Sequence, residues 1–121
     1  APTAQERLLL RWEETILEMD QALKDAIDAT TMLDAIKNRM GQDEASATAE
    51  AAGANAETRK AAATVALGAN PGYQQSAAQL VTLDALLGHA RRRLEIAKET
   101  RRLLQATATL LAGEEDTHDG N

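Results

Sequence analysis

Residues 9–40 read LLRWEETILEMDQALKDAIDATTMLDAIKNRM, a stretch without glycine or proline in which apolar residues recur at alternating intervals of three and four. A repeat of seven keeps one narrow stripe of a helix facing a partner over many turns. The stripe holds Leu9, Trp12, Ile16, Met19, Leu23, Ala26, Thr30, Leu33, Lys37 and Met40. Thr3 and Glu6 have the spacing of a capping box just before it. The stretch therefore predicts one long helix over residues 3–40, which Gly41 either ends as a left-handed C-cap or continues at a cost of about 1 kcal/mol.

The same spacing returns in the second half of the chain. Asn70 and Pro71 suit the first turn of a helix, and Gly113 suits its end. The stripe between them holds Tyr73, Ser76, Leu80, Leu83, Leu87, Ala90, Leu94, Ala97, Arg101, Leu104, Ala108 and Leu111. This pattern predicts a second long helix over residues 71–112. Gly88, inside it, indicates a close approach by a neighbouring helix.

The segment between the two long helices is rich in alanine. Residues 42–54 contain no large apolar side chain, so they form either solvated helix or loop. Asn55 is a good N-cap for a short helix that Gly68 ends. We expect an all-α fold with two long antiparallel coiled-coil helices, about 3–40 and 71–112, joined by this segment. The expected single helical-hairpin domain covers residues 1–112, and the acidic tail 113–121 is expected to be disordered.

Burial in such a fold has to come from helix pairing. Trp12 and Tyr73 are the only aromatic residues among 121, and Trp12 is bulky for a two-helix seam. Its size favours a larger bundle, so we expect an oligomer, either a homodimer or a homotetramer. The predicted oligomer seam consists of Leu9, Trp12, Ile16, Met19, Leu23, Leu33, Leu80, Leu83, Leu87, Leu94, Leu104 and Leu111.

Charge is divided unevenly along the chain. Residues 1–50 carry eleven acidic and five basic side chains, whereas residues 51–112 carry four acidic and eight basic ones. Opposite charges on the two long helices favour an antiparallel hairpin, although exposed pairs contribute only about 0.2–1 kcal/mol each. The repeat predicts cross-pairs between Glu13 or Asp20 and Arg91 or Lys98.

No residue group has the composition and spacing of an active site. The chain has no cysteine, its two histidines are isolated, and its glycines match no phosphate-binding loop. We therefore expect no enzyme activity, no catalytic residue, no cofactor and no metal. No stretch approaches the roughly 20 consecutive apolar residues of a membrane span, so a cytoplasmic protein is expected.

The basic side chains of the second half allow two interpretations. They either pair with the acidic first helix or contact the phosphates of single-stranded DNA. The candidate nucleic-acid contacts are Arg59, Lys60, Arg91, Arg92, Arg93, Lys98 and Arg102. No aromatic platform for stacking bases accompanies them. A third hypothesis is an inhibitor of a nucleic-acid enzyme that uses an acidic face made of Glu13, Glu14, Glu18, Asp20, Asp25 and Asp28.

Residues 53–61 read GANAETRKA. This junction, with Tyr73 and Gln74 at the next helix start, resembles the small helical-hairpin proteins of tailed phages and prophages, and the likeness covers residues 5–111. The resemblance implies a phage-encoded protein in the host cytoplasm, in the genomic company of recombination and replication genes that include single-strand annealing proteins. It marks as functional candidates Gly53, Asn55, Glu57, Arg59 and Lys60. A helix stop, an N-cap and a glutamate favoured by the helix dipole also explain this junction.

These observations favour a non-enzymatic coiled-coil structural or accessory protein. It is expected to oligomerise through its stripes and to bind another macromolecule, whose identity the sequence leaves open. The alternatives are an accessory of phage recombination that binds single-stranded DNA and the acidic inhibitor.

Overall fold

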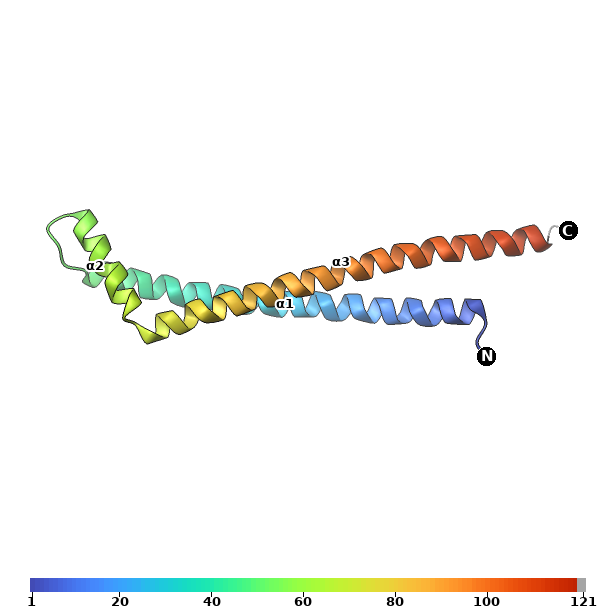
Figure 1. The fold of residues 1–121 in the computed structure, drawn as a ribbon, viewed down its shortest axis with the longest axis horizontal. Coiled ribbons are helices and arrows are strands. Elements are labelled where there is room, and N and C mark those ends of the chain that lie inside the picture. Colours follow the sequence, from blue (N-terminus) through green and yellow to red (C-terminus); the bar gives the residue numbers. More distant parts are fainter. Residues whose placement is uncertain (120–121) are drawn as a thin grey trace. The chain divides into compact units, whose positions relative to one another are not determined.

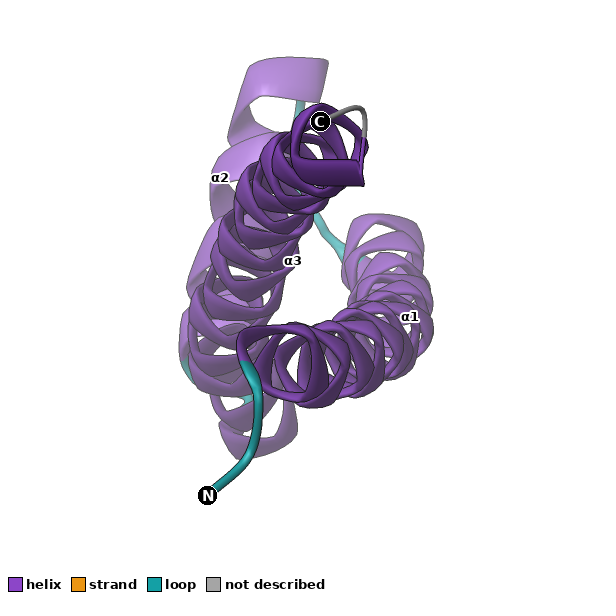
Figure 2. Cartoon of the chain, turned by 90° about the vertical axis from the view of Figure 1, so that its right-hand side faces the viewer, coloured by secondary structure: helices purple, strands orange, loops and turns teal. Residues whose placement is uncertain are grey.

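The computed structural model describes residues 1–119, with side chains for residues 1–114. This part of the chain consists of three helices, α1 (Ala4–Glu50), α2 (Ala56–Gly68) and α3 (Pro71–Asp119) (Figure 1). Short loops join them, and Figure 2 shows no strand among the described residues. The prediction of an all-α fold with two long helices is confirmed.

Both long helices extend beyond their predicted ends. α1 passes through Gly41 and includes residues 42–50, and α3 passes through Gly113 to Asp119. Neither glycine has a positive φ, so neither is a left-handed cap. A glycine inside a helix costs only about 1 kcal/mol, too little to end an otherwise favourable helix. The predicted end near residue 112 is therefore wrong, and of the predicted tail only residues 120–121 lie outside the described residues.

The N-caps are those that the sequence predicts. The backbone N–H of Glu6 donates to Oγ1 of Thr3 at 3.1 Å, and the Thr3 N–H donates to Oε2 of Glu6 at 3.4 Å, which completes the capping box. Oδ1 of Asn55 accepts from the N–H of Thr58 at 2.8 Å. Oδ1 of Asn70 accepts from the N–H of Tyr73 at 3.2 Å. Each cap satisfies a backbone donor that the first turn leaves without a partner.

The internal contacts group the chain into two compact units. Unit 1 is Ala1–Ala26 with Gly88–Asn121, and unit 2 is Ile27–Leu87. In unit 1 the first part of α1 lies antiparallel to the second part of α3 (Figure 1). Unit 2 combines the rest of α1 with α2 and the first part of α3. The single helical-hairpin domain over residues 1–112 stays a prediction.

Small side chains make up everything that unit 1 buries and half of what unit 2 buries. The buried residues of unit 1 are Thr15, Ala22, Ala90 and Ala97. Those of unit 2 are Ala29, Leu33, Ile36, Ala63, Ser76 and Leu87. Thr15 is accommodated because its hydroxyl donates to the Arg11 carbonyl at 2.8 Å, so no polar atom is left without a partner. Helix axes approach more closely where the contact residues are small.

Along α1, the buried and half-buried side chains recur every seven residues, but on a line that differs from the prediction. They include Leu8, Trp12, Thr15, Met19, Ala22, Ala26, Ala29, Leu33, Ile36 and Met40. Half of this line was predicted. The other five residues of the predicted stripe are exposed, namely Leu9, Ile16, Leu23, Thr30 and Lys37. In each case the residue one position earlier takes the buried place, so these five predicted stripe positions are wrong.

Along α3, the predicted stripe coincides with the buried and half-buried side chains, except at Arg101, which is exposed. Burying the charged guanidinium of Arg101 without a partner would be costly, and its long side chain reaches water from the edge of the helix pair. The expected close approach at Gly88 is also not found, because a Cβ built there meets no atom of a neighbouring helix within 4 Å among the described residues.

Candidate interaction surfaces

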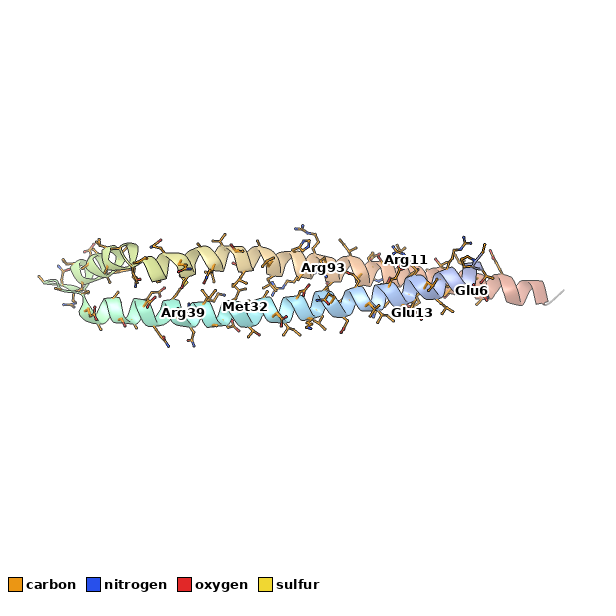
Figure 3. All side chains as sticks on the ribbon, turned by 90° about the horizontal axis from the view of Figure 1, so that it is seen from below. Glu6, Arg11, Glu13, Met32, Arg39 and Arg93 are labelled. Atoms are coloured by element: carbon orange, nitrogen blue, oxygen red, sulfur yellow. The ribbon has the colours of Figure 1, made fainter. Side chains whose placement is uncertain are left out.

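Arg93 of α3 joins the two helices of unit 1. Its Nε donates to Oε1 of Glu18 at 2.9 Å, and one terminal nitrogen donates to Oδ2 of Asp25 at 2.6 Å. Figure 3 labels the Arg93 side chain on α3. The hydrogen bond from Arg93 lowers the pKa of Asp25, and a second one from Gln21 adds to this. The Asp25 carboxylate in turn raises the pKa of Arg93. Arg93, a candidate phosphate contact, is thus used in pairing the helices.

The cross-pairs in unit 1 differ from those predicted. Arg93 pairs with Glu18 and Asp25, in place of Arg91 or Lys98 with Glu13 or Asp20. The reason is the one-residue change of the buried line on α1. With Thr15 and Ala22 buried, the side chains three positions later stand at the edge of the helix pair, and these are Glu18 and Asp25. The signal in the sequence was two carboxylates seven residues apart.

The other candidate phosphate contacts are spread over both units. Lys98 lies 3.5 Å from Glu95 and Arg102 lies 3.0 Å from Glu99, each within one turn of α3. Arg91 and Arg92 are exposed on α3 in unit 1. Arg59 and Lys60 are exposed on α2 in unit 2. Neighbouring carboxylates therefore offset the positive charge of three of the five α3 candidates, namely Arg93, Lys98 and Arg102.

The predicted seam residues also fall into separate groups. Leu33 and Leu87 are buried within unit 2. A second group is half-buried, namely Trp12, Met19, Leu80, Leu83, Leu94, Leu104 and Leu111. The remaining three stay largely in water, with 64% of Leu9, 48% of Ile16 and 48% of Leu23 exposed. We call these three residues the apolar row.

The apolar row lies on the flank of unit 1 opposite to the Arg93 ion pairs. On α1, Glu18 is three residues after buried Thr15, whereas Ile16 is one residue after it, and successive helical residues are about 100° apart. The two therefore stand on opposite sides of the buried line. The same arithmetic around Ala90 places Arg91 opposite to Arg93. Arg91, with Lys98 one heptad later, thus lies on the same flank as the apolar row.

Two charged rows border the apolar row. Glu13 and Asp20, four residues after Leu9 and Ile16, lie along its outer edge on α1, and we call them the acidic row. Figure 3 shows Glu13 and Arg11 on opposite sides of α1, as expected for residues two positions apart. Arg91 and Lys98 on α3 form the basic row, in which Lys98 also pairs with Glu95 of its own helix at 3.5 Å. This flank therefore presents an acidic row, an apolar row and a basic row, in that order.

Unit 2 contains a groove where its three helical segments meet. The groove has a volume of about 840 Å³ and includes Glu44 of α1, Arg59, Lys60 and Leu67 of α2, and Tyr73 of α3 in its lining. The Tyr73 hydroxyl donates to Oε1 of Glu44 at 2.9 Å. This hydrogen bond raises the pKa of Tyr73, since the ionised phenol could not donate it.

The junction residues before α2 have evident structural roles. Asn55 accepts from both the backbone N–H and the hydroxyl of Thr58, each at 2.8 Å. The guanidinium of Arg59 donates to the Gly53 carbonyl at 3.5 Å. A Cβ at Gly53 would lie only 3.0 Å from the backbone nitrogen of Arg59 and 3.0 Å from Cβ of Thr58. Glu57 stands in the first turn of α2, where the helix dipole favours an acid.

Within the described residues, no three histidine, aspartate or glutamate side chains gather closely enough to hold a metal ion. None of the helices there is both long and apolar enough to cross a membrane. Comparisons with protein families, with curated proteins and with solved structures find no match to this chain.

Proposed function

We propose that this protein is a non-enzymatic helical assembly protein that self-associates through the apolar row of unit 1. The observation that carries the proposal is the exposure of Leu9, Ile16 and Leu23 beside half-buried Trp12 and Met19. These five residues form a second seven-residue stripe on α1, next to the line already used against α3. A helix with two such stripes packs against two partners at once.

Completing the burial of the apolar row stabilises association. Full burial of a leucine or isoleucine contributes about 1.5–3 kcal/mol, and about half of that remains to be gained by side chains that are half exposed. Three such residues from each of two copies therefore contribute several kcal/mol, of the order of the cost of immobilising two molecules. The half-buried indole of Trp12 adds to this area.

The competing interpretations receive less support from the charges. A phosphate-binding surface would use Arg93, which already binds Glu18 and Asp25, and Lys98 and Arg102 each have a glutamate within one turn. The acidic-inhibitor hypothesis likewise uses Glu18 and Asp25. The assembled protein is proposed to bind another macromolecule in the cytoplasm, a reducing compartment that suits a chain without cysteine. A phage origin is proposed on the junction resemblance alone.

The test is size-exclusion chromatography with light scattering over a range of protein concentrations. The wild type should form a discrete dimer or tetramer that dissociates on dilution. The triple variant Leu9→Gln/Ile16→Gln/Leu23→Gln should be monomeric with unchanged helicity by circular dichroism. Leu10→Gln/Leu17→Gln is the matched control, because these leucines are also exposed but lie beyond the acidic row, and it should still assemble.

Two results would count against the proposal. A wild-type chain that stays monomeric at every accessible concentration would overturn self-association. Co-elution with a labelled single-stranded oligonucleotide at about 50 mM salt, lost by about 200 mM, would favour the nucleic-acid hypothesis instead.

A further inference from the structure

We infer that the apolar row binds a second copy of this chain in parallel orientation, with the acidic row of each copy facing the basic row of the other. This inference rests on the self-association proposed above and adds to it the orientation and the charge pairs. The evidence is the order of the three rows on one flank of unit 1.

Symmetry allows two ways to pair this flank with itself through a two-fold axis in the interface. An axis along the helices keeps their direction and reverses the order of the rows, so acidic faces basic on both sides of the apolar contact. An axis across the helices reverses their direction and keeps the order of the rows. The two acidic rows then face each other, and so do the two basic rows. Only the parallel pair is electrostatically complementary.

The levels of the charged residues along the helices also suit the parallel pair. Arg93 contacts both Glu18 and Asp25, so its position along the axis of α1 falls between these two residues. Because α3 runs antiparallel to α1 in unit 1, Arg91 lies toward Asp25 and Lys98 toward Ile16. Asp20 falls between these two levels, and Glu13 falls within about one turn of Lys98. A two-fold axis parallel to the helices keeps each residue's position along them. Glu13 and Asp20 of one copy therefore lie near the basic row of the other copy.

Charge selects the orientation here more than it adds affinity. Exposed ion pairs contribute only about 0.2–1 kcal/mol each, but like charges brought together at an interface disfavour the alternative arrangement. Flanking charges of this kind set partner orientation in helical assemblies, while the apolar contacts supply the binding energy.

Disulfide trapping tests the orientation directly, since the natural chain contains no cysteine. In a parallel pair the two copies of residue 9 lie opposite each other, so Leu9→Cys alone should cross-link under mild oxidation, as should Leu23→Cys alone. In an antiparallel pair neither variant links to itself, and a mixture of the two gives the cross-linked heterodimer. Ile16→Cys, at the middle of the row, should link in either orientation and is the control for intact assembly.

Charge reversal provides an independent readout. Glu13→Lys/Asp20→Lys should raise the dissociation constant about tenfold or more, because two basic rows then face each other. Adding Arg91→Glu/Lys98→Glu to the same chain exchanges the rows and should restore assembly. Unchanged affinity in the first variant, or cross-linking only between Leu9→Cys and Leu23→Cys, would overturn the parallel pair alone. Absence of cross-linking in all three variants, with a monomeric wild type, would instead overturn the proposed function.

Discussion

Arg93 of α3 donates hydrogen bonds to two carboxylates of α1 that lie one heptad apart, Glu18 and Asp25. One guanidinium thereby spans two turns of the facing helix. The pairing marks the edge of the helix pair in unit 1, and it leaves Leu9, Ile16 and Leu23 on the opposite flank. The same contact therefore explains the loss of one phosphate-binding candidate and the position of the apolar row.

The stability of unit 1 should decrease at acidic pH because Asp25 becomes protonated. Its pKa is lowered in the folded chain, mainly by Arg93, so its contribution is fully present above the unfolded pKa of about 3.9 and is lost as the pH falls through the lower folded value. Denaturant unfolding at a series of pH values should show the wild type converging with Asp25→Asn in that range. A wild type that keeps its advantage over Asp25→Asn at the lowest pH would argue against this contribution.

The neighbouring residues Ala22 and Leu23 distinguish the observed buried line from the predicted one. Ala22 is fully buried, so Ala22→Leu should lower the free energy of unfolding by about 1–3 kcal/mol through overpacking. Leu23→Ala should cost less than about 1 kcal/mol at concentrations where the chain is monomeric. If Leu23→Ala instead costs the 2–5 kcal/mol typical of a core leucine, the predicted line is correct.

Gly53 and Gly41 should respond oppositely to substitution by alanine. The new Cβ at Gly53 crowds Thr58 and the Arg59 backbone, so Gly53→Ala should destabilise the start of α2. A Cβ at Gly41 meets nothing within 4 Å, and Gly41→Ala should stabilise α1 by about 0.5–1 kcal/mol. Thermal unfolding measures both. A neutral or stabilising Gly53→Ala would show that the junction can relax without cost.

Tyr73 is the only tyrosine, so its ionisation can be followed by ultraviolet absorbance. The hydrogen bond to Glu44 raises its pKa, with a smaller effect from Asp43. Its stabilising contribution is therefore present below the unfolded pKa of about 10 and is lost as the pH rises through the higher folded value. Glu44→Ala should lower the midpoint toward that of an ordinary tyrosine, because the hydrogen bond to Glu44 is the largest cause of the raised pKa. Equal midpoints in the two proteins would argue against the contact.

Features that depend on neighbouring residues could be predicted from the sequence. The capping box at Thr3, the N-caps at Asn55 and Asn70, and the stripe on α3 are confirmed, because each follows from hydrogen bonds or spacing within one helix. The ends of the long helices were harder to predict. Gly41 and Gly113 have the composition of stops, yet an isolated glycine costs less than the favourable turns on either side of it contribute.

From the spacing of its residues alone, α1 could be predicted as a long helix with Trp12, Met19 and Ala26 on its inner side. It contained two overlapping seven-residue stripes that share these residues, one through Leu9, Ile16 and Leu23 and the other through their preceding neighbours. Local hydrophobicity favours the first stripe. The contacts with α3 select the second stripe, because its alanine and threonine side chains are buried and Arg93 reaches two carboxylates beside them. That choice left the larger apolar side chains exposed, and they form the surface on which the proposed function rests.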